Sequence, residues 1–157
     1  MREIQWTKDQ KKIIEQRDAN ILVSAAAGSG KTAVLVERIF QRLTDLTKPI
    51  DIDQFVVVTF TRAAASQMKD RLMERIEKAL EKNPQDRHLQ RQMALLPSAH
   101  ISTVHSFCGY VIRNYFHRIG LDPSYRQGTV SELALIKKEV MGELLEEEYE
   151  QQREDFM

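Results

Sequence analysis

The run Ser24-Ala25-Ala26-Ala27-Gly28-Ser29-Gly30-Lys31-Thr32 follows the apolar residues Ile21-Leu22-Val23 and precedes a segment with helical periodicity. Its second half matches the end of the phosphate-binding loop pattern G-x-x-x-x-G-K-[ST]. Small residues let backbone amides approach a polyphosphate, and the positive N-terminus of the next helix attracts the anion. Ala25 stands at the first pattern position, where Gly is usual, and adds only a methyl group. The order of strand, loop and helix favours a nucleotide-binding loop over an ordinary helix start.

Two side chains of this loop are candidates for chemistry on the nucleotide. We expect Lys31 to reach the β- and γ-phosphate oxygens as a compact point charge, and the Thr32 hydroxyl to supply one ligand to Mg²⁺. These two residues are the predicted catalytic pair. The predicted nucleotide contacts in the loop are Ala25, Ala26, Ala27, Gly28, Ser29, Gly30, Lys31 and Thr32.

Gln10 lies upstream of the loop, in the pattern Thr7-x-x-Gln10. In one interpretation the two residues form a capping box that closes a helix N-terminus. In the other, the Gln10 amide offers a donor and an acceptor to the N6/N7 edge of adenine. The phosphate-binding loop nearby favours the adenine interpretation, although the cap on its own would be the simpler one.

Apolar patterns divide the rest of the chain into alternating strands and helices. Residues 21–23, 55–58 and 100–104 predict three parallel strands, and the continuous run 55–58 is typical of a strand buried on both faces. Helical spacing predicts buried stripes in the intervening segments at Leu35, Val36, Ile39, Phe40 and Leu43, and at Met68, Leu72, Ile76 and Leu80. We therefore expect an α/β fold, a three-layer parallel sheet with helices on both faces.

The C-terminal third is predicted to be helical. One helix begins at His105 and ends before Gly120, with apolar positions predicted to be buried at Val111, Ile112, Tyr115, Phe116 and Ile119. The capping box Thr129-x-x-Glu132 begins another helix that runs into an acidic segment. The expected domain division is 1–120 for the sheet domain and 121–157 for a helical segment.

The composition excludes several classes of protein. Lys plus Arg and Asp plus Glu each number 23, so a nucleic-acid site would have to be a local patch. The single cysteine, Cys108, excludes an internal disulfide, and we expect it to be a small buried residue. No signal-peptide pattern or membrane-length apolar run is found, and the histidines lack metal-ligand spacing. We expect a cytoplasmic protein without a membrane partner or a His/Cys metal site.

Polar and aromatic residues follow the second and third predicted strands. Ligands gather at the carboxyl ends of parallel strands, where hydroxyls and Arg can contact phosphates and an exposed Phe can stack on an unpaired base. Two alternatives stay open, because Phe60 and Phe107 could be core residues, and Thr61 and Ser106 could be helix caps. The candidate DNA-binding residues are Thr59, Phe60, Thr61, Arg62, Thr103, His105, Ser106 and Phe107.

These segments resemble motifs of superfamily 1 DNA helicases of the UvrD/Rep type, and within that group the AddA (RecB-like) helicase–nucleases of bacteria. The resemblance rests on Thr7-x-x-Gln10, on Ala25 to Thr32, on Val58-Thr59-Phe60-Thr61-Arg62-Ala63-Ala64-Ala65-x-x-Met68-Lys69, and on Ser102-Thr103-Val104-His105-Ser106-Phe107-Cys108. Their order and spacing match from end to end. The family usually has Asn at the position of Arg62, where a cation would favour a phosphate contact.

The resemblance implies a RecA-like motor domain (1A), with residues 121–157 beginning the accessory domain 1B. It implies ATP- and Mg²⁺-dependent movement along single-stranded DNA, unwinding from duplex ends, and a role in double-strand-break repair and recombination. An AddA-like protein would also be an exonuclease with an AddB-like partner. Because no apolar strand of this sequence ends in Asp-Glu, the carboxylates that hold Mg²⁺ are not found in it. We therefore expect a motor-domain fragment that is inactive by itself.

Three other functions stay open at this point. A UvrD-like helicase without a nuclease would carry the same motifs. A small P-loop kinase or NTPase would share only the phosphate-binding loop, and a binding module could retain that loop without hydrolysis.

Overall fold

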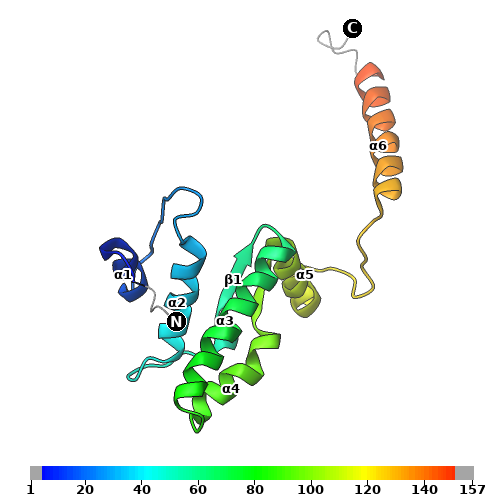
Figure 1. Ribbon diagram of the computed structural model, residues 1–157. Helices are drawn as coiled ribbons and strands as arrows, with labels where there is room; N and C mark the ends of the chain where they lie inside the picture. Colours follow the sequence, from blue (N-terminus) through cyan, green and yellow to red (C-terminus); the bar gives the residue numbers. More distant parts are fainter. Residues whose placement is uncertain (1–4, 151–157) are drawn as a thin grey trace. The chain divides into compact units, whose positions relative to one another are not determined.

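The computed structural model describes residues 5–150 (Figure 1). The chain divides into two compact units, one ending at Ile112 and the other beginning at Arg113. In chain order the elements are α1 (Lys8–Glu15), α2 (Lys31–Leu43), the 3₁₀ turn η1 (Ile52–Gln54), β1 (Val56–Thr59), α3 (Arg62–Lys82), α4 (Arg87–Leu95), η2 (Leu96–Ser98), β2 (His100–Thr103), α5 (Val104–Tyr115), η3 (Phe116–Arg118) and α6 (Val130–Glu150).

The sheet of the first unit is built from two parallel strands. β1 pairs with β2 in a register that runs from Val56 opposite His100 to Thr59 opposite Thr103. The connection passes through α3 and α4, since parallel strands need a crossover of this kind. α3 lies along β1 and beside α4 (Figure 1). The two strands therefore end at the same edge, next to the start of α3.

The prediction of a third strand at residues 21–23 is wrong for the described chain. These residues are extended but unpaired, and Leu22 is 97% exposed. A strand needs a hydrogen-bonded neighbour, and within residues 5–150 the sheet contains only β1 and β2. The structure is therefore mixed α/β, and it does not show the predicted three-layer sheet.

The expectation that residues 55–58 are buried on both faces is also wrong. Val57 is buried against α3, whereas Val56 and Val58 are 54% and 48% exposed. Successive side chains of a strand point to opposite faces, and within the described residues helices cover one face of the sheet.

The core lies between the sheet, α2, α3 and α4. Three predicted positions of α3, Met68, Leu72 and Ile76, are buried there, and so are four of the five predicted positions of α2. The exception is Leu35, which is 38% exposed while Val34 is buried instead. This core fixes α2, which is the helix that begins directly after the phosphate-binding loop.

Polar contacts tie the helices of this core together. The fully buried Gln92 of α4 accepts a hydrogen bond from the Ile52 amide at 2.8 Å and donates to Asp51 at 2.6 Å. Arg75 of α3 forms an ion pair with Glu37 of α2 at 2.9 Å. Its guanidinium carbon also lies 3.9 Å from the centre of the Phe40 ring. α2 and α3 are thereby joined by both charge and packing.

The helical C-terminal part has mostly exposed apolar residues. The prediction that the apolar positions of α5 and η3 are buried is wrong, because Tyr115 and Ile119 are 52% and 62% exposed. Gly120, before which the helix was predicted to end, has a left-handed backbone with φ +66°. Among residues 5–150, no helix is long and apolar enough to cross a membrane.

The predicted capping box at the start of α6 is confirmed. The Thr129 amide donates to Glu132 at 2.7 Å, and the Glu132 amide donates to the Thr129 hydroxyl at 3.3 Å. The Arg126 guanidinium, together with Thr129, lowers the pKa of Glu132 to about 2. Because this pKa is depressed, the ionised Glu132 carboxylate stabilises the folded chain at neutral pH. This stabilisation is lost as the pH falls through the lowered pKa.

Candidate functional site

The phosphate-binding loop ends in two glycines with left-handed backbones. Gly28 has φ +78° and Gly30, the N-cap of α2, has φ +84°. Glycine adopts these angles without steric cost, whereas a residue with a Cβ atom does not. The Val34 amide donates to the Gly30 carbonyl at 2.9 Å, so the helix begins directly after the loop. The free amides at the start of α2 are therefore next to the loop, as an anion site requires.

The side chain of Lys31 folds back over this loop. Its Nζ donates to the carbonyl oxygens of Ala25 at 2.6 Å and Ala26 at 2.8 Å. A cation is thus held at the loop, where a phosphate oxygen would gain a charged partner. Thr32 follows in the first turn of α2 and is partly exposed. The loop and the ammonium lie together, and the Thr32 hydroxyl is on the next residue, a donor set whose chemistry suits a polyphosphate.

Gln10 connects α1 to the loop. Its Oε1 accepts from the Thr7 amide at 2.9 Å, and the Gln10 amide donates to the Thr7 hydroxyl at 3.3 Å, so the capping box is confirmed. Its Nε2 donates to the Ser29 carbonyl at 3.2 Å. A Cβ atom added at Gly30 would lie 3.4 Å from this Nε2. Gln10 therefore packs directly against the phosphate-binding loop.

These contacts leave room for the second interpretation of Gln10. A side-chain amide has two N–H donors and a carbonyl oxygen with two lone pairs. One donor is used by Ser29 and one lone pair by Thr7, and these partners also fix which way the amide points. One donor and one acceptor remain, which is the pair that the adenine edge requires. The cap and adenine recognition are therefore compatible.

A cavity of about 530 Å³ lies between α1, the loop and α2. This volume is within the usual range of about 300–1,000 Å³ for small-molecule sites. Its lining residues are Thr7, Asp9, Gln10, Ile13, Val23, Ser24, Ala25, Ser29, Lys31, Val34, Leu35 and Arg38. The predicted Gln10, Ala25, Ser29 and Lys31 thus lie around one space.

Among the lining residues that sequence reasoning did not assign to the site are Leu35 and Arg38. Both lie on α2, and Arg38 is seven residues, or about two turns, after Lys31. Helical spacing from Lys31 was the signal that could have identified it. Burial is the main reason that the pKa of Arg38 is lowered, and the neighbouring positive charges of Arg17 and Arg42 lower it further.

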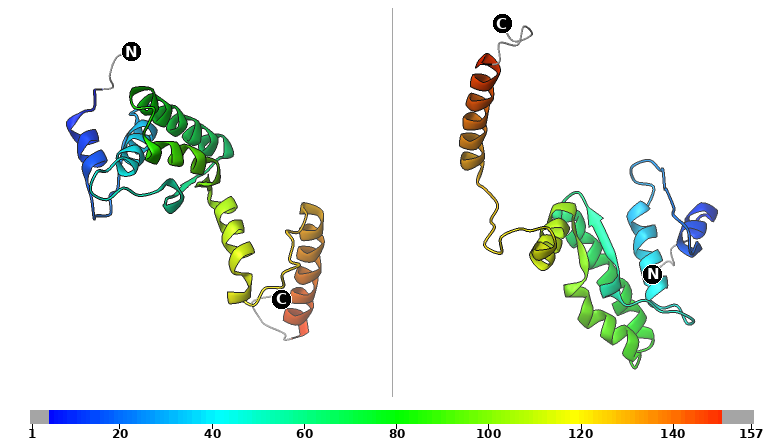
Figure 2. Two further views of the ribbon diagram at one scale, coloured as in Figure 1. Left: turned by 90° about the horizontal axis from the view of Figure 1, so that it is seen from below. Right: turned by 180° about the vertical axis from the view of Figure 1, so that it is seen from behind.

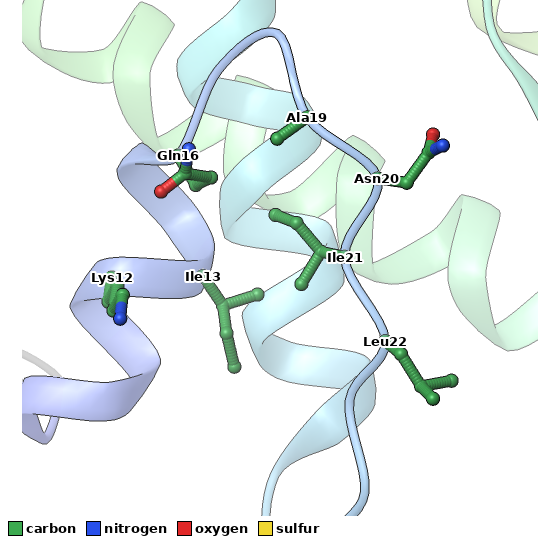
Figure 3. Close-up of a pocket in the computed structure, with 7 residues that line it drawn as sticks. All are labelled: Lys12, Ile13, Gln16, Ala19, Asn20, Ile21 and Leu22. Carbon is green, nitrogen blue, oxygen red and sulfur yellow. The ribbon is translucent and has the colours of Figure 1, made fainter.

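A second cavity of about 300 Å³ lies between α1 and residues 19–22 (Figure 3). Ile13 of α1 and Ile21 of the extended segment face one another across it, whereas Asn20 points away (Figure 3). This side of α1 is therefore loosely packed.

The residues after β1 begin α3 and lie at the edge where both strands end. The Thr61 hydroxyl accepts from the Ala64 amide at 3.1 Å, which confirms it as the N-cap of α3. Phe60 is 99% exposed, so its interpretation as a core residue is wrong. Arg62 and Thr61 are also exposed, and Thr59 donates to the Thr61 carbonyl at 2.9 Å. An aromatic ring and a cation, two positions apart in the chain, are thus both exposed.

The residues after β2 are more occupied by local contacts. Thr103, not Ser106, accepts from a backbone amide, since the Ser106 amide donates to its hydroxyl at 3.2 Å. Phe107 is partly buried, and its ring centre lies 6.2 Å from that of His100 and 6.3 Å from that of Tyr110. His105 is exposed. Register places Thr103 opposite Thr59, so both groups of predicted DNA-binding residues share one edge.

Among residues 5–150, no group of three His, Cys, Asp or Glu side chains could hold a metal ion. Cys108 is exposed, which corrects the expectation that it is buried. It lies on α5, where no residue is buried.

Comparison with known proteins agrees with this arrangement. Residues 6–156 match the family described as the UvrD/REP helicase N-terminal domain. The chain is 54% identical over 152 residues to an ATP-dependent helicase/nuclease subunit of Clostridioides difficile, covering 97% of this chain and 12% of the relative. The proteins of the same description from Lachnoclostridium phytofermentans and Anoxybacillus flavithermus are 55% and 51% identical, covering 100% and 99% of this chain. The chain spans 11–13% of the length of these three relatives.

Proposed function

Since the chain belongs to the UvrD/REP helicase N-terminal domain family, we propose that it supplies the ATP-binding part of an ATP-dependent DNA helicase. The observation that carries the proposal is the cavity around which the capping-box glutamine, the phosphate-binding loop and its lysine meet. Adenine would bind to Gln10 and the polyphosphate to the loop and α2. Lys31 would hold the phosphate oxygens, and Thr32 would be a ligand of Mg²⁺.

DNA would bind at the edge where β1 and β2 end. Phe60 would stack on a base and Arg62 would contact a phosphate, and the exposure of both supports this, whereas Thr103 mainly holds the start of α5. Thr59, Thr61, His105, Ser106 and Phe107 complete the proposed strand-binding edge. The bound strand would be single-stranded DNA, and the protein would begin to act at the end of a duplex.

We further propose that the full-length protein is a helicase–nuclease of double-strand-break repair with an AddB-like partner. The support is the description shared by the relatives, which names a helicase/nuclease built from subunits. In this proposal residues 1–120 belong to the motor domain 1A, and residues 121–157 begin the accessory domain 1B. A cytoplasmic location would follow from the action on DNA.

Hydrolysis of ATP by the full-length protein, with and without a single-stranded oligonucleotide, tests the proposal. We expect stimulation by the oligonucleotide, and degradation of duplex ends if a nuclease is present. Unwinding without degradation would favour a UvrD-like helicase. Phosphate transfer to a small acceptor without DNA stimulation would contradict the proposal and favour a kinase.

Gln10→Ala tests the adenine contact. Alanine removes Oε1 and Nε2, but its backbone amide still donates to the Thr7 hydroxyl, so this half of the capping box is preserved. We expect the preference for ATP over GTP to fall by about 1–3 kcal/mol, measured by competition binding. The reason is that Oε1 can accept from the N6 amino group of adenine, whereas it would face the O6 acceptor of guanine. Gln16→Ala, on an exposed residue just after α1, is the control, and an unchanged preference in Gln10→Ala would remove adenine recognition from its role.

Phe60→Ala and Arg62→Ala separate stacking from phosphate contact. We expect Phe60→Ala to weaken single-stranded DNA binding by roughly 1–3 kcal/mol at an unchanged salt slope. Arg62→Ala should lower the slope of log K against log salt by about 0.7. Salt titrations followed by fluorescence anisotropy measure both quantities.

Arg87→Ala is the matched control for these variants. Arg87 is exposed at the start of α4, beyond the far end of the 21-residue helix α3, which is about 30 Å long. If Arg62→Ala has the wild-type slope, or if Phe60→Ala binds normally, that residue does not contact DNA.

A further inference from the structure

Arg38 of α2 reaches across to the end of α1. Its Nη1 donates to the carbonyl oxygens of Ile13 and, at 2.7 Å, of Gln16, with a longer contact to Ile14 at 3.5 Å. α1 and α2 lie side by side in all three ribbon views (Figures 1 and 2). One guanidinium thus joins the phosphate-binding helix to the helix that carries Gln10.

The carbonyls that Arg38 binds are those that a helix end leaves without partners. The last four C=O groups of a helix have no intrahelical donor, and a cation there is also favoured by the negative end of the helix dipole. Arg17 binds the neighbouring carbonyls of Ile14 at 2.7 Å and Glu15 at 2.8 Å. Arg17 is the second residue after α1, so it closes the end of its own helix, whereas Arg38 joins that helix to α2.

Apolar packing alone holds α1 weakly. The helix has eight residues, a length that is marginal without tertiary contacts. Ile14 is its buried side chain, and the cavity of about 300 Å³ separates its other face from residues 19–22 (Figure 3). The Arg38 hydrogen bonds are therefore a large share of what docks α1.

The position of α1 sets the position of the Gln10 amide. Gln10 lies one turn before Ile13 on the same short helix, and its Nε2 meets the Ser29 carbonyl at 3.2 Å. If the C-terminal end of α1 moves away from α2, the helix turns as a body and this contact opens. The remaining donor and acceptor of the Gln10 amide then no longer have a fixed position relative to the phosphate-binding loop.

We propose that Arg38 is a positioning residue, which clamps α1 onto α2 so that Gln10 can discriminate adenine from guanine. The inference rests on the proposed function, because it assumes that a nucleotide fills the cavity between α1, the loop and α2. Arg38 also lines that cavity, and a direct contact with phosphate is the competing role. The two roles differ in their effect, since ATP and GTP carry the same phosphates.

The test measures equilibrium binding of ATP and of GTP to the full-length protein and its variants, by competition with a fluorescent nucleotide. Arg38→Met keeps the length of the side chain but removes its donors, and we expect the ratio of ATP to GTP affinity to fall about tenfold. Arg38→Lys, which keeps a charged donor, should restore part of the ratio. Combined with Gln10→Ala, Arg38→Met should cause little further loss of the ratio, because both act through one contact.

Arg75→Met is the matched control. It breaks the ion pair with Glu37 between α3 and α2, so it should lower the melting temperature while leaving the nucleotide ratio unchanged. Equal weakening of ATP and GTP in Arg38→Met, or a wild-type ratio, would overturn the inference while Gln10→Ala still supported the proposed function. A wild-type protein without preference for ATP would overturn adenine recognition and this inference together.

Discussion

Replacement of Lys31 by Ala in the full-length protein is expected to lower DNA-stimulated ATP hydrolysis at least about 100-fold. Lys31 is the cation at the loop, and removal of one preorganised charge-stabilising group at a reaction centre typically has an effect of roughly 10²–10³ on the rate. Unwinding should be lost with hydrolysis. Steady-state phosphate release with saturating oligonucleotide is the measurement.

The structure adds a second consequence of this substitution. Lys31→Ala also removes the two hydrogen bonds to the Ala25 and Ala26 carbonyls, so the loop loses contacts that stabilise its own conformation. Lys48→Ala, at an exposed loop position, is the control and should have wild-type activity. Wild-type turnover in Lys31→Ala would show that the loop is not the catalytic phosphate site. If turnover is lost, a melting temperature equal to that of the wild type would exclude misfolding as the cause.

Leu72→Ala is expected to lower the free energy of unfolding of the chain by about 2–5 kcal/mol. Leu72 of α3 is fully buried in the core between α2, α3, α4 and the sheet, so the removed atoms leave a cavity as well as a loss of burial. Natural domains have only about 5–15 kcal/mol of stability, so this single change is a large part of it. Urea unfolding followed by circular dichroism measures the change.

Leu46→Ala is the same chemical change at a fully exposed position. Its effect should be within about 0.5 kcal/mol. If the two variants are equally stable, α3 does not pack in the core as the structure shows.

Local patterns were sufficient to predict much of the fold and the site. The small residues and glycines before Lys31 define the loop through their own backbone preferences, and Thr7 and Gln10 define a cap three residues apart. The stripe of Met68, Leu72 and Ile76 depends only on helical periodicity. The order of strand, helices and strand between residues 55 and 104 likewise follows from the periodicity of the chain itself.

Other features depended on partners that a local pattern cannot show. The apolar residues 21–23 have strand propensity, yet they lack a neighbouring strand within the described residues, and Val56 and Val58 lack a cover on their face of the sheet. Propensity sets what a segment favours, whereas pairing and burial depend on what lies beside it. The same reason applies to the exposed apolar residues of α5.

The dual role of Gln10 shows where sequence and tertiary structure meet in this protein. Sequence determined that Gln10 could serve as a cap or as an adenine ligand, because both need only its amide and its distance from Thr7. The fold is compatible with both roles, since the Thr7 amide and the Ser29 carbonyl leave one acceptor site and one donor of the Gln10 amide unused by these contacts. It also decided that Arg38, 28 residues away, fastens the helix on which Gln10 lies, because hydrogen bonds between elements form only when packing has brought them together.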